Sequence, residues 1–143
     1  MGCVPYNGSI YAFGGVNKHH NMVDYIQKYD TTLNTCEMLN PLPKSMQCCA
    51  AVWGPHAFVI SPVDCLVYDL DDMKNGLIVN KPSLGAQSDM FSVLADNGVI
   101  FVVGGRKSKR DEAPSYTGFD YVRYLGARRI LGEEKEWTLP KIT

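Results

Sequence analysis

Two copies of a nine-residue motif, 90 positions apart, constrain the fold of this chain more than any other feature. Residues 7–15 read NGSIYAFGG and residues 97–105 read NGVIFVVGG. Ninety positions are two steps of about 45, a period typical of repeat architectures in which one supersecondary unit packs on the next. A middle copy is therefore expected near residue 59. Residues 54–61 supply it in degenerate form, GPHAFVIS, with Ile60 and Ser61 in place of the glycine doublet.

Each copy is predicted to begin with a β-hairpin. Asn-Gly between two apolar runs is a strong hairpin signal, because a type I′ turn needs positive φ at both central residues. Gly54-Pro55 in the middle copy is expected to form the same turn. The strand that follows, as in residues 100–103, is apolar on both faces, which is typical of a strand buried between sheets. The doublet is expected to end this strand, since glycine permits φ values that other residues avoid.

Further sequence features recur in each copy of the repeat. Tyr29-Asp30 and Tyr68-Asp69 each precede a polar turn and a short strand, near residues 37–39 and 77–79. The third copy is looser, with strands expected at residues 119–124 and 137–139 and space for one helical turn within residues 125–136. We therefore predict an all-β fold of four-stranded antiparallel units, at about residues 2–40, 47–80 and 89–140.

The order of these sequence features resembles that of the kelch repeat, which forms one blade of a β-propeller. The resemblance is best over residues 10–52, and the matching marks are Gly14-Gly15, Tyr29-Asp30, Leu42-Pro43 and Ala50-Ala51-Val52. Cys36 stands where a tryptophan is usual, Met46 stands where an arginine is common, and Trp137 restores the tryptophan in the third copy. The resemblance implies a partial kelch β-propeller of about three four-stranded blades.

Three blades leave such a propeller open, since propellers close with about 4 to 8 blades. An open arc would expose two sheet faces and unpaired strand edges to water. We therefore expect a piece of a larger propeller, a truncated product, or an arc that other blades or a second copy of the chain completes.

Composition argues against nucleic acid and membrane partners. The chain has 14 Lys and Arg against 15 Asp and Glu, a net charge of -1, so no overall field attracts polyanions or anionic lipid. It has neither an apolar run of about 18 residues nor the basic and apolar regions of a signal peptide. A soluble, cytoplasmic protein with five reduced cysteines is expected. Cys36 and Cys49 are interpreted as small core residues.

No residue pattern predicts a catalytic site, a metal site or a cofactor. His19 and His20 are adjacent on extended chain, so their side chains point apart, and no third ligand stands nearby. The acidic run after Asp69 lacks the glycine position and final glutamate of a calcium loop. Gly2 is expected inside a strand, and Tyr6 replaces the Ser or Thr that N-terminal acylation requires.

The connections at the ends of the strands are the predicted binding surface, because rigid blades present their loops to partners. Residues 16–23, 61–63 and 106–115 follow the second strands, residues 41–47 and 81–89 join successive blades, and all are expected on one face. The basic run at residues 106–110 would suit an acidic peptide, although such a run is more often a solvated loop tip. The candidate partner-binding residues are Asn17, Lys18, His19, His20, Lys44, Ser45, Gln87, Ser88, Arg106, Lys107, Lys109 and Arg110.

The kelch resemblance implies a non-catalytic module that binds a protein or a peptide. Kelch domains of this type often follow a BTB domain and select substrates for cullin-based ubiquitin ligases, so an adaptor role is the finer expectation. No BTB domain is present in these 143 residues. An actin-binding or structural kelch protein is the alternative. A propeller enzyme and a truncated product without independent function rank below both.

Overall fold

Eleven strands in three antiparallel sheets make up the part of the chain that the computed structural model describes, residues 1–61, 64–82, 88–107 and 122–126. Sheet 1 is formed, in this order, by β1 (Gly2–Tyr6), β2 (Ser9–Phe13), β3 (Ile26–Asp30) and β4 (Thr35–Met38). Sheet 2 is formed by β5 (Cys49–Trp53), β6 (His56–Ile60), β7 (Asp64–Asp69) and β8 (Leu77–Pro82), with a 3-10 turn η1 (Met73–Asn75) between the last two. Sheet 3 is formed by β11 (Val122–Gly126), β10 (Val99–Lys107) and β9 (Ser88–Asp96).

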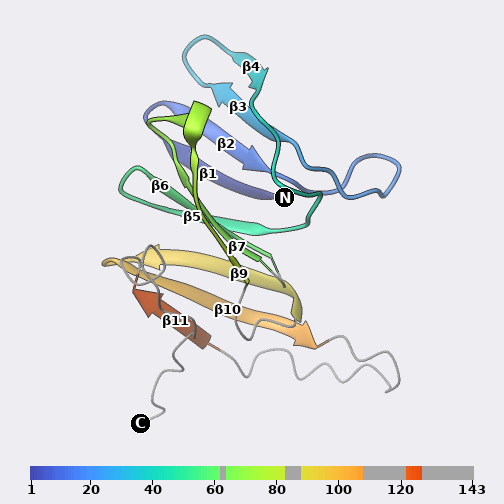
Figure 1. Cartoon of the computed structure of the whole chain (residues 1–143), viewed down its shortest axis with the longest axis vertical. Coiled ribbons are helices and arrows are strands. Elements are labelled where there is room, and N and C mark those ends of the chain that lie inside the picture. Colours follow the sequence, from blue (N-terminus) through green and yellow to red (C-terminus); the bar gives the residue numbers. More distant parts are fainter. Residues whose placement is uncertain (62–63, 83–87, 108–121, 127–143) are drawn as a thin grey trace.

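The three sheets are stacked in chain order, with sheet 2 between sheets 1 and 3 (Figure 1). The first strands of the three sheets are neighbours, because β5 lies beside β1 on one side and beside β9 on the other. This arrangement confirms the all-β fold of antiparallel units. It also explains the residue patterns of the second strands. Strand β6, inside the stack, is buried on both faces from Ala57 to Ile60, whereas in β2 of the end sheet buried residues alternate with exposed or half-buried ones.

The turns between first and second strands follow local chemistry. Asn7 and Gly8 have φ of 47° and 79°, and Asn97 and Gly98 have φ of 53° and 75°, so both Asn-Gly turns are confirmed as type I′ in φ. Gly54-Pro55 differs from the expectation. Only its first residue has a positive φ, 59°, because the proline ring holds φ near about −65°. This is the φ pattern of a type II′ turn, which also joins antiparallel strands in two residues.

Two apolar clusters hold the sheets together. Between sheets 1 and 2, the rings of Phe13 and Tyr68 pack with centroids 5.5 Å apart at an interplanar angle of 39°. Between sheets 2 and 3, Phe58 and Ile60 pack with Ile100, and all three side chains are fully buried. Burial of apolar area of this kind is the dominant favourable contribution to folding. The sheets therefore depend on one another for stability.

The second glycine doublet does not end its strand, contrary to the expectation. Strand β10 continues through Gly104 to Lys107, because β9 is nine residues long and offers a partner that far, pairing Arg106 with Asp89 and Lys107 with Ser88. The loop predicted at residues 106–115 therefore begins later. The predicted connection at residues 81–89 is likewise shorter, since its first two and last two residues belong to β8 and β9.

Cys36 is not a core residue. It lies on β4, whose four residues are all exposed, and it pairs with Tyr29 on the face of sheet 1 that points away from sheet 2. The side chains at this edge of the stack have no neighbouring sheet to bury them in the described part of the chain. Cys49 is half-buried, and the fully buried thiols among the described residues are those of Cys48 and Cys65.

Candidate functional site

Three connections gather at one edge of the stack, where β2, β4 and β6 end. We call this the loop edge, comprising residues 14–25 and 39–48 together with Ser61 and Asp64. Backbone hydrogen bonds join its first two segments: Gly15 N donates to Met46 O at 2.9 Å, and Met46 N donates to Val23 O at 3.2 Å. Leu42 N also donates to Asp24 O at 2.8 Å. The expectation that the first two loops open on the same side is therefore confirmed.

The first glycine doublet makes this close approach possible. Gly14 and Gly15 have φ of 60° and 106°, a region that other residues rarely adopt. A Cβ atom on Gly14 would lie 2.4 Å from the carbonyl oxygen of Met46. The doublet thus lets the chain leave β2, turn sharply and pair with the connection to sheet 2.

The loop after β2 is a short, ordered hairpin. Val16 and Met22 form an isolated antiparallel bridge at its base. At its tip the side-chain oxygen of Asn17 accepts hydrogen bonds from the backbone N–H groups of His19 at 2.9 Å and Asn21 at 3.1 Å, and Asn17 N donates to Asn21 O at 2.9 Å. An Asn side chain that closes its own turn in this way fixes the backbone before any partner arrives.

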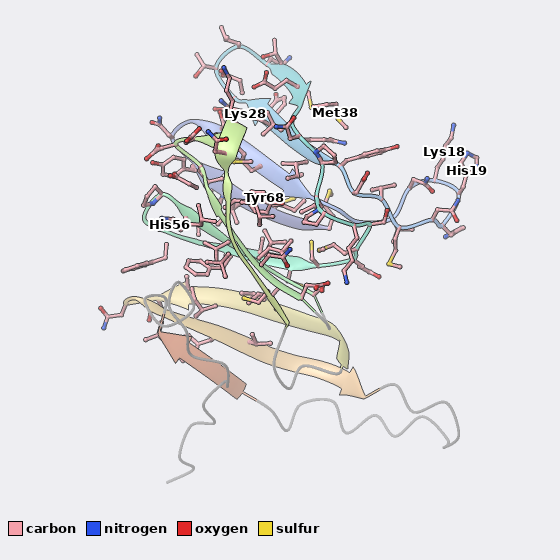
Figure 2. All side chains as sticks on the ribbon, viewed as in Figure 1. Lys18, His19, Lys28, Met38, His56 and Tyr68 are labelled. Carbon is pink, nitrogen blue, oxygen red and sulfur yellow. The ribbon has the colours of Figure 1, made fainter. Side chains whose placement is uncertain are left out.

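This tip presents the predicted basic residues to solvent. Lys18, His19 and His20 are all exposed, and Lys18 and His19 extend from the tip away from the three sheets (Figure 2). His20 has a φ of 63°, in the left-handed region that few residues adopt. Lys18 takes part in no salt bridge within the described chain. The tip therefore offers a cation and two imidazoles on a fixed backbone.

The connection between sheets 1 and 2 is tied to sheet 2 by an ion pair. Lys44 Nζ lies 2.8 Å from Asp64 Oδ2, with the lysine side chain 54% exposed and the carboxylate 16% exposed. The backbone N–H of Asp64 also donates to Ser61 Oγ at 2.9 Å. Lys44 is thus partly neutralised, and Ser45 beside it is exposed. The structure brings these two residues to the same edge as the hairpin tip.

The remaining predicted binding residues have a different placement or lie outside the described chain. Arg106 and Lys107 belong to β10, and Ser88 pairs with Lys107 on β9. β10 runs in the same direction as β2, so it also ends toward the loop edge (Figure 1). Gln87, Lys109 and Arg110 lie outside the described residues.

The side chains described at the loop edge include charged and hydrogen-bonding groups. In the described residues, no group of three or more His, Cys, Asp or Glu side chains could hold a metal ion. The loop edge includes the buried thiol of Cys48, whose Sγ donates to Phe13 O at 3.2 Å. Burial raises the pKa of Cys48 to about 11, so at neutral pH it is a protonated thiol and a poor nucleophile.

A groove at the opposite edge was not anticipated from the sequence. It has a volume of about 320 Å³ and lies where the turn after β7 meets the outer strands of sheet 1, with Lys28, Glu37 and Lys74 among its lining residues. The Tyr6 hydroxyl donates to Asp71 Oδ1 at 2.7 Å close by, and this hydrogen bond raises the pKa of Tyr6. The groove is of mixed charge, so it does not distinguish a class of ligand.

Sequence reasoning also missed the role of Asn17, which it included only as an exposed candidate. The signal was available, since Asn is a residue that commonly hydrogen-bonds backbone N–H groups two residues on. The Lys44–Asp64 ion pair had no such signal, because 20 positions of chain separate the two residues and only the stacking of sheets 1 and 2 brings them together.

Comparisons with known proteins identify the repeat in one sheet. Residues 1–43 match the family model of the kelch motif, a range that contains sheet 1 and the start of the connection to sheet 2. This match supports a relation to kelch repeats, which typically form non-catalytic protein-interaction domains. A comparison with curated proteins finds no match. No helix in the described residues is long and apolar enough to cross a membrane.

Proposed function

We propose that the chain is a non-catalytic protein-interaction module that uses its loop edge to bind a protein or peptide. The observation that carries the proposal is the hairpin tip closed by Asn17, which holds Lys18, His19 and His20 exposed on a fixed backbone. A preorganised loop loses little conformational entropy on binding, so its contacts convert more fully into affinity. The kelch match over residues 1–43 supports the same class of function.

The partner should be a polypeptide with acidic or hydrogen-bond-accepting groups. Lys18 supplies an uncompensated cation within the described chain, and the neighbouring Lys44 and Ser45 add further donors. Strand β10 ends at Lys107, which pairs with Ser88 at the start of β9. Charges at the rim of such a surface mainly set the rate and specificity of association.

The finer proposal is a substrate adaptor for a cullin-based ubiquitin ligase. That role requires a BTB domain from elsewhere, so it predicts that the chain binds its partner but does not bind a cullin by itself. A pull-down of purified cullin with the chain alone should therefore be empty, and capture should appear only when a BTB domain is fused ahead of residue 1. Sedimentation of the chain with actin filaments would instead favour the cytoskeletal alternative.

The experiment for the general proposal is selection of binding peptides from a random library, followed by affinity measurement on variants. Lys18→Glu should lower the affinity of the chain for the selected acidic peptides by about tenfold or more, because it reverses a charge at the rim of the binding surface. Asn17→Ala should also lower this affinity, because the hairpin tip loses the hydrogen bonds that order it. The matched control is Lys74→Glu, which reverses another exposed cation at the opposite edge.

Two results would contradict the proposal. Peptides whose affinity responds to Lys74→Glu but not to Lys18→Glu would place binding at the opposite edge. Selection that yields no peptide above background for a folded wild-type chain would remove the loop edge as a binding surface.

A further inference from the structure

The dipeptide Asn-Gly occurs three times in this chain, at Asn7-Gly8, Asn75-Gly76 and Asn97-Gly98. All three asparagines are exposed. Asparagine is a chemically labile residue, because the backbone nitrogen of the next residue can attack its side-chain carbonyl carbon. Glycine in that next position favours the attack, since it has no side chain to obstruct the approach. The fold places the three dipeptides in different surroundings, so their reactivities should differ.

The turn between β1 and β2 leaves Asn7-Gly8 the most open of the three. Both residues are exposed, and nothing outside the neighbouring residues lies within 4 Å of the position that a Cβ atom on Gly8 would take. In a two-residue hairpin turn the closing hydrogen bond joins the flanking residues, here Tyr6 and Ser9. The nitrogen of Gly8 is therefore not engaged by the turn.

The turn between β9 and β10 has the same backbone but is crowded. Asn97 and Gly98 have φ of 53° and 75°, close to the 47° and 79° of Asn7 and Gly8. A Cβ atom on Gly98, however, would lie 3.4 Å from the ring of Trp53. Ring closure requires rotation of the asparagine backbone, so packing against the glycine should slow the reaction.

The third dipeptide is restrained by a 3-10 turn. Asn75 is the last residue of η1, whose i→i+3 hydrogen bonds engage backbone N–H groups, and Gly76 is buried. A Cβ atom on Gly76 would lie 3.1 Å from both Cα and Sδ of Met73. Asn75 should therefore also react more slowly than Asn7.

Thr31 holds the Asn7-Gly8 turn closed without blocking the reacting nitrogen. Its backbone N–H donates to Gly8 O at 3.1 Å, and its Oγ1 donates to the same oxygen at 2.6 Å. Both hydrogen bonds end on the carbonyl oxygen of Gly8. They oppose the opening of the turn, so they set how often the Gly8 nitrogen can reach the Asn7 side chain.

We propose that Asn7 is a site of spontaneous deamidation in the folded chain. The Gly8 nitrogen loses its proton and forms a bond to Cγ of Asn7, the bond from Cγ to Nδ2 breaks, and ammonia leaves with that proton. The product is a five-membered cyclic imide. Water then adds to either of its two carbonyl carbons and opens the ring, giving aspartate or isoaspartate. The net reaction consumes one water and releases one ammonia.

Isoaspartate at this position would disturb the contact between sheets 1 and 2. Its main chain runs through the former side-chain carbon, so the two-residue turn gains one carbon atom. The turn sets Tyr6 opposite Ser9, and the Tyr6 hydroxyl donates to Asp71 Oδ1 of sheet 2 at 2.7 Å. This turn lies at the edge opposite the loop edge, so the proposal is independent of partner binding there.

Peptide mapping by mass spectrometry, after incubation of the folded wild-type chain at mildly alkaline pH, measures the conversion of each asparagine. Asn7 should convert at least about tenfold faster than Asn75 and Asn97. The same chain unfolded in concentrated guanidinium is the control, and there the three should convert at similar rates. Equal rates at Asn7 and Asn97 in the folded chain would overturn the proposal, as would an Asn7 that stays intact while the unfolded chain reacts.

A variant tests whether opening of the turn governs the reaction. Thr31→Val removes the hydrogen bond from Oγ1 and keeps the one from the backbone N–H. It should speed the conversion of Asn7 severalfold and leave that of Asn97 unchanged. An unchanged rate at Asn7 would contradict the role of the turn and overturn the argument for this site.

Asn7→Asp separates the new charge from the longer main chain. Asp-Gly also suits a type I′ turn, so this variant should melt at the Tm of the wild-type chain. The isoaspartate form, separated from incubated wild-type chain by ion exchange, should melt at a lower temperature. Equal melting of the two forms would show that the longer turn leaves the contact between sheets 1 and 2 intact, against the proposal.

Discussion

Replacing Tyr68 by phenylalanine should stabilise the protein. The Tyr68 side chain is 4% exposed, and its hydroxyl is buried with no hydrogen-bond partner among the described residues. A buried polar group left without a partner costs about 1–3 kcal/mol. Phenylalanine keeps the ring on Phe13 and removes only this group, so Tyr68→Phe should raise the free energy of unfolding by about 1 kcal/mol. For a chain of this length, that is an increase in Tm of about 4 °C.

The same substitution should change the pH dependence with a defined sign. Burial, and then the nearby Cys48, raises the pKa of Tyr68 to about 12, against an ordinary value of 10.0. A raised folded-state pKa in an acid means that the unfolded chain releases its proton first, so stability is lost between pH 10 and pH 12. At pH 11 the free energy of unfolding is lower by about 1.4 kcal/mol for this reason, and the Tyr68→Phe variant does not lose it because phenylalanine has no ionisable hydroxyl. The advantage of the variant should therefore grow from about 1 kcal/mol at pH 8 to about 2.4 kcal/mol at pH 11.

Urea unfolding followed by far-ultraviolet circular dichroism, at one protein concentration and at both pH values, measures these differences. Tyr6→Phe is the matched control: its hydroxyl donates a hydrogen bond to Asp71 at 2.7 Å, so this variant should be less stable than the wild-type chain. The reasoning is refuted if Tyr68→Phe is destabilised by about 1 kcal/mol or more with an unchanged m value, because the hydroxyl would then have a partner.

Three further outcomes follow from the loops and the core. Gly14→Ala should cost at least about 2 kcal/mol in urea unfolding, because its Cβ would meet Met46 O at 2.4 Å, whereas Gly8→Ala, where φ is 79° but nothing lies within 4 Å, should cost about 1 kcal/mol; equal losses would show that φ alone matters. Asn17→Ala should speed hydrogen exchange at the hairpin tip without a change in Tm of more than about 2 °C, and unchanged exchange would mean that its side chain does not order the tip. Cys48 should resist iodoacetamide at about pH 8 in the folded protein and react once the chain is unfolded in concentrated urea, because burial raises its pKa to about 11; fast modification of the folded form would contradict its burial.

The turns could be read from sequence because their chemistry is local. Asn7-Gly8 and Asn97-Gly98 require φ values that few residues adopt, and no tertiary contact is needed to state this. The same local reasoning predicted four strands in each of the first two units and the position of the hairpin loop after β2. It did not distinguish Gly54-Pro55 from the Asn-Gly turns, although the fixed φ of proline contained that information.

The errors arose where a residue's environment depends on a neighbouring sheet. Cys36 was interpreted as buried from its position in the repeat, but no sheet covers that face in the described chain, so it is exposed. Gly104 was expected to end its strand as Gly14 does, but β9 extends far enough to keep pairing with β10. The effect of a glycine on a strand thus depends on the length of the strand beside it.

Periodicity, turn chemistry and charge are properties of short segments, so the repeat, the all-β class, the type I′ hairpins and the basic character of the connections could all be inferred from the amino-acid sequence. The packing of the sheets was needed to show which faces are covered, which loops meet at one edge and which cation is neutralised. The Lys44–Asp64 pair, the burial of Tyr68 and the exposure of Cys36 all depend on how sheets from separate parts of the chain pack together. Such packing joins residues that share no local pattern, so it cannot be inferred from the spacing of residues along the chain.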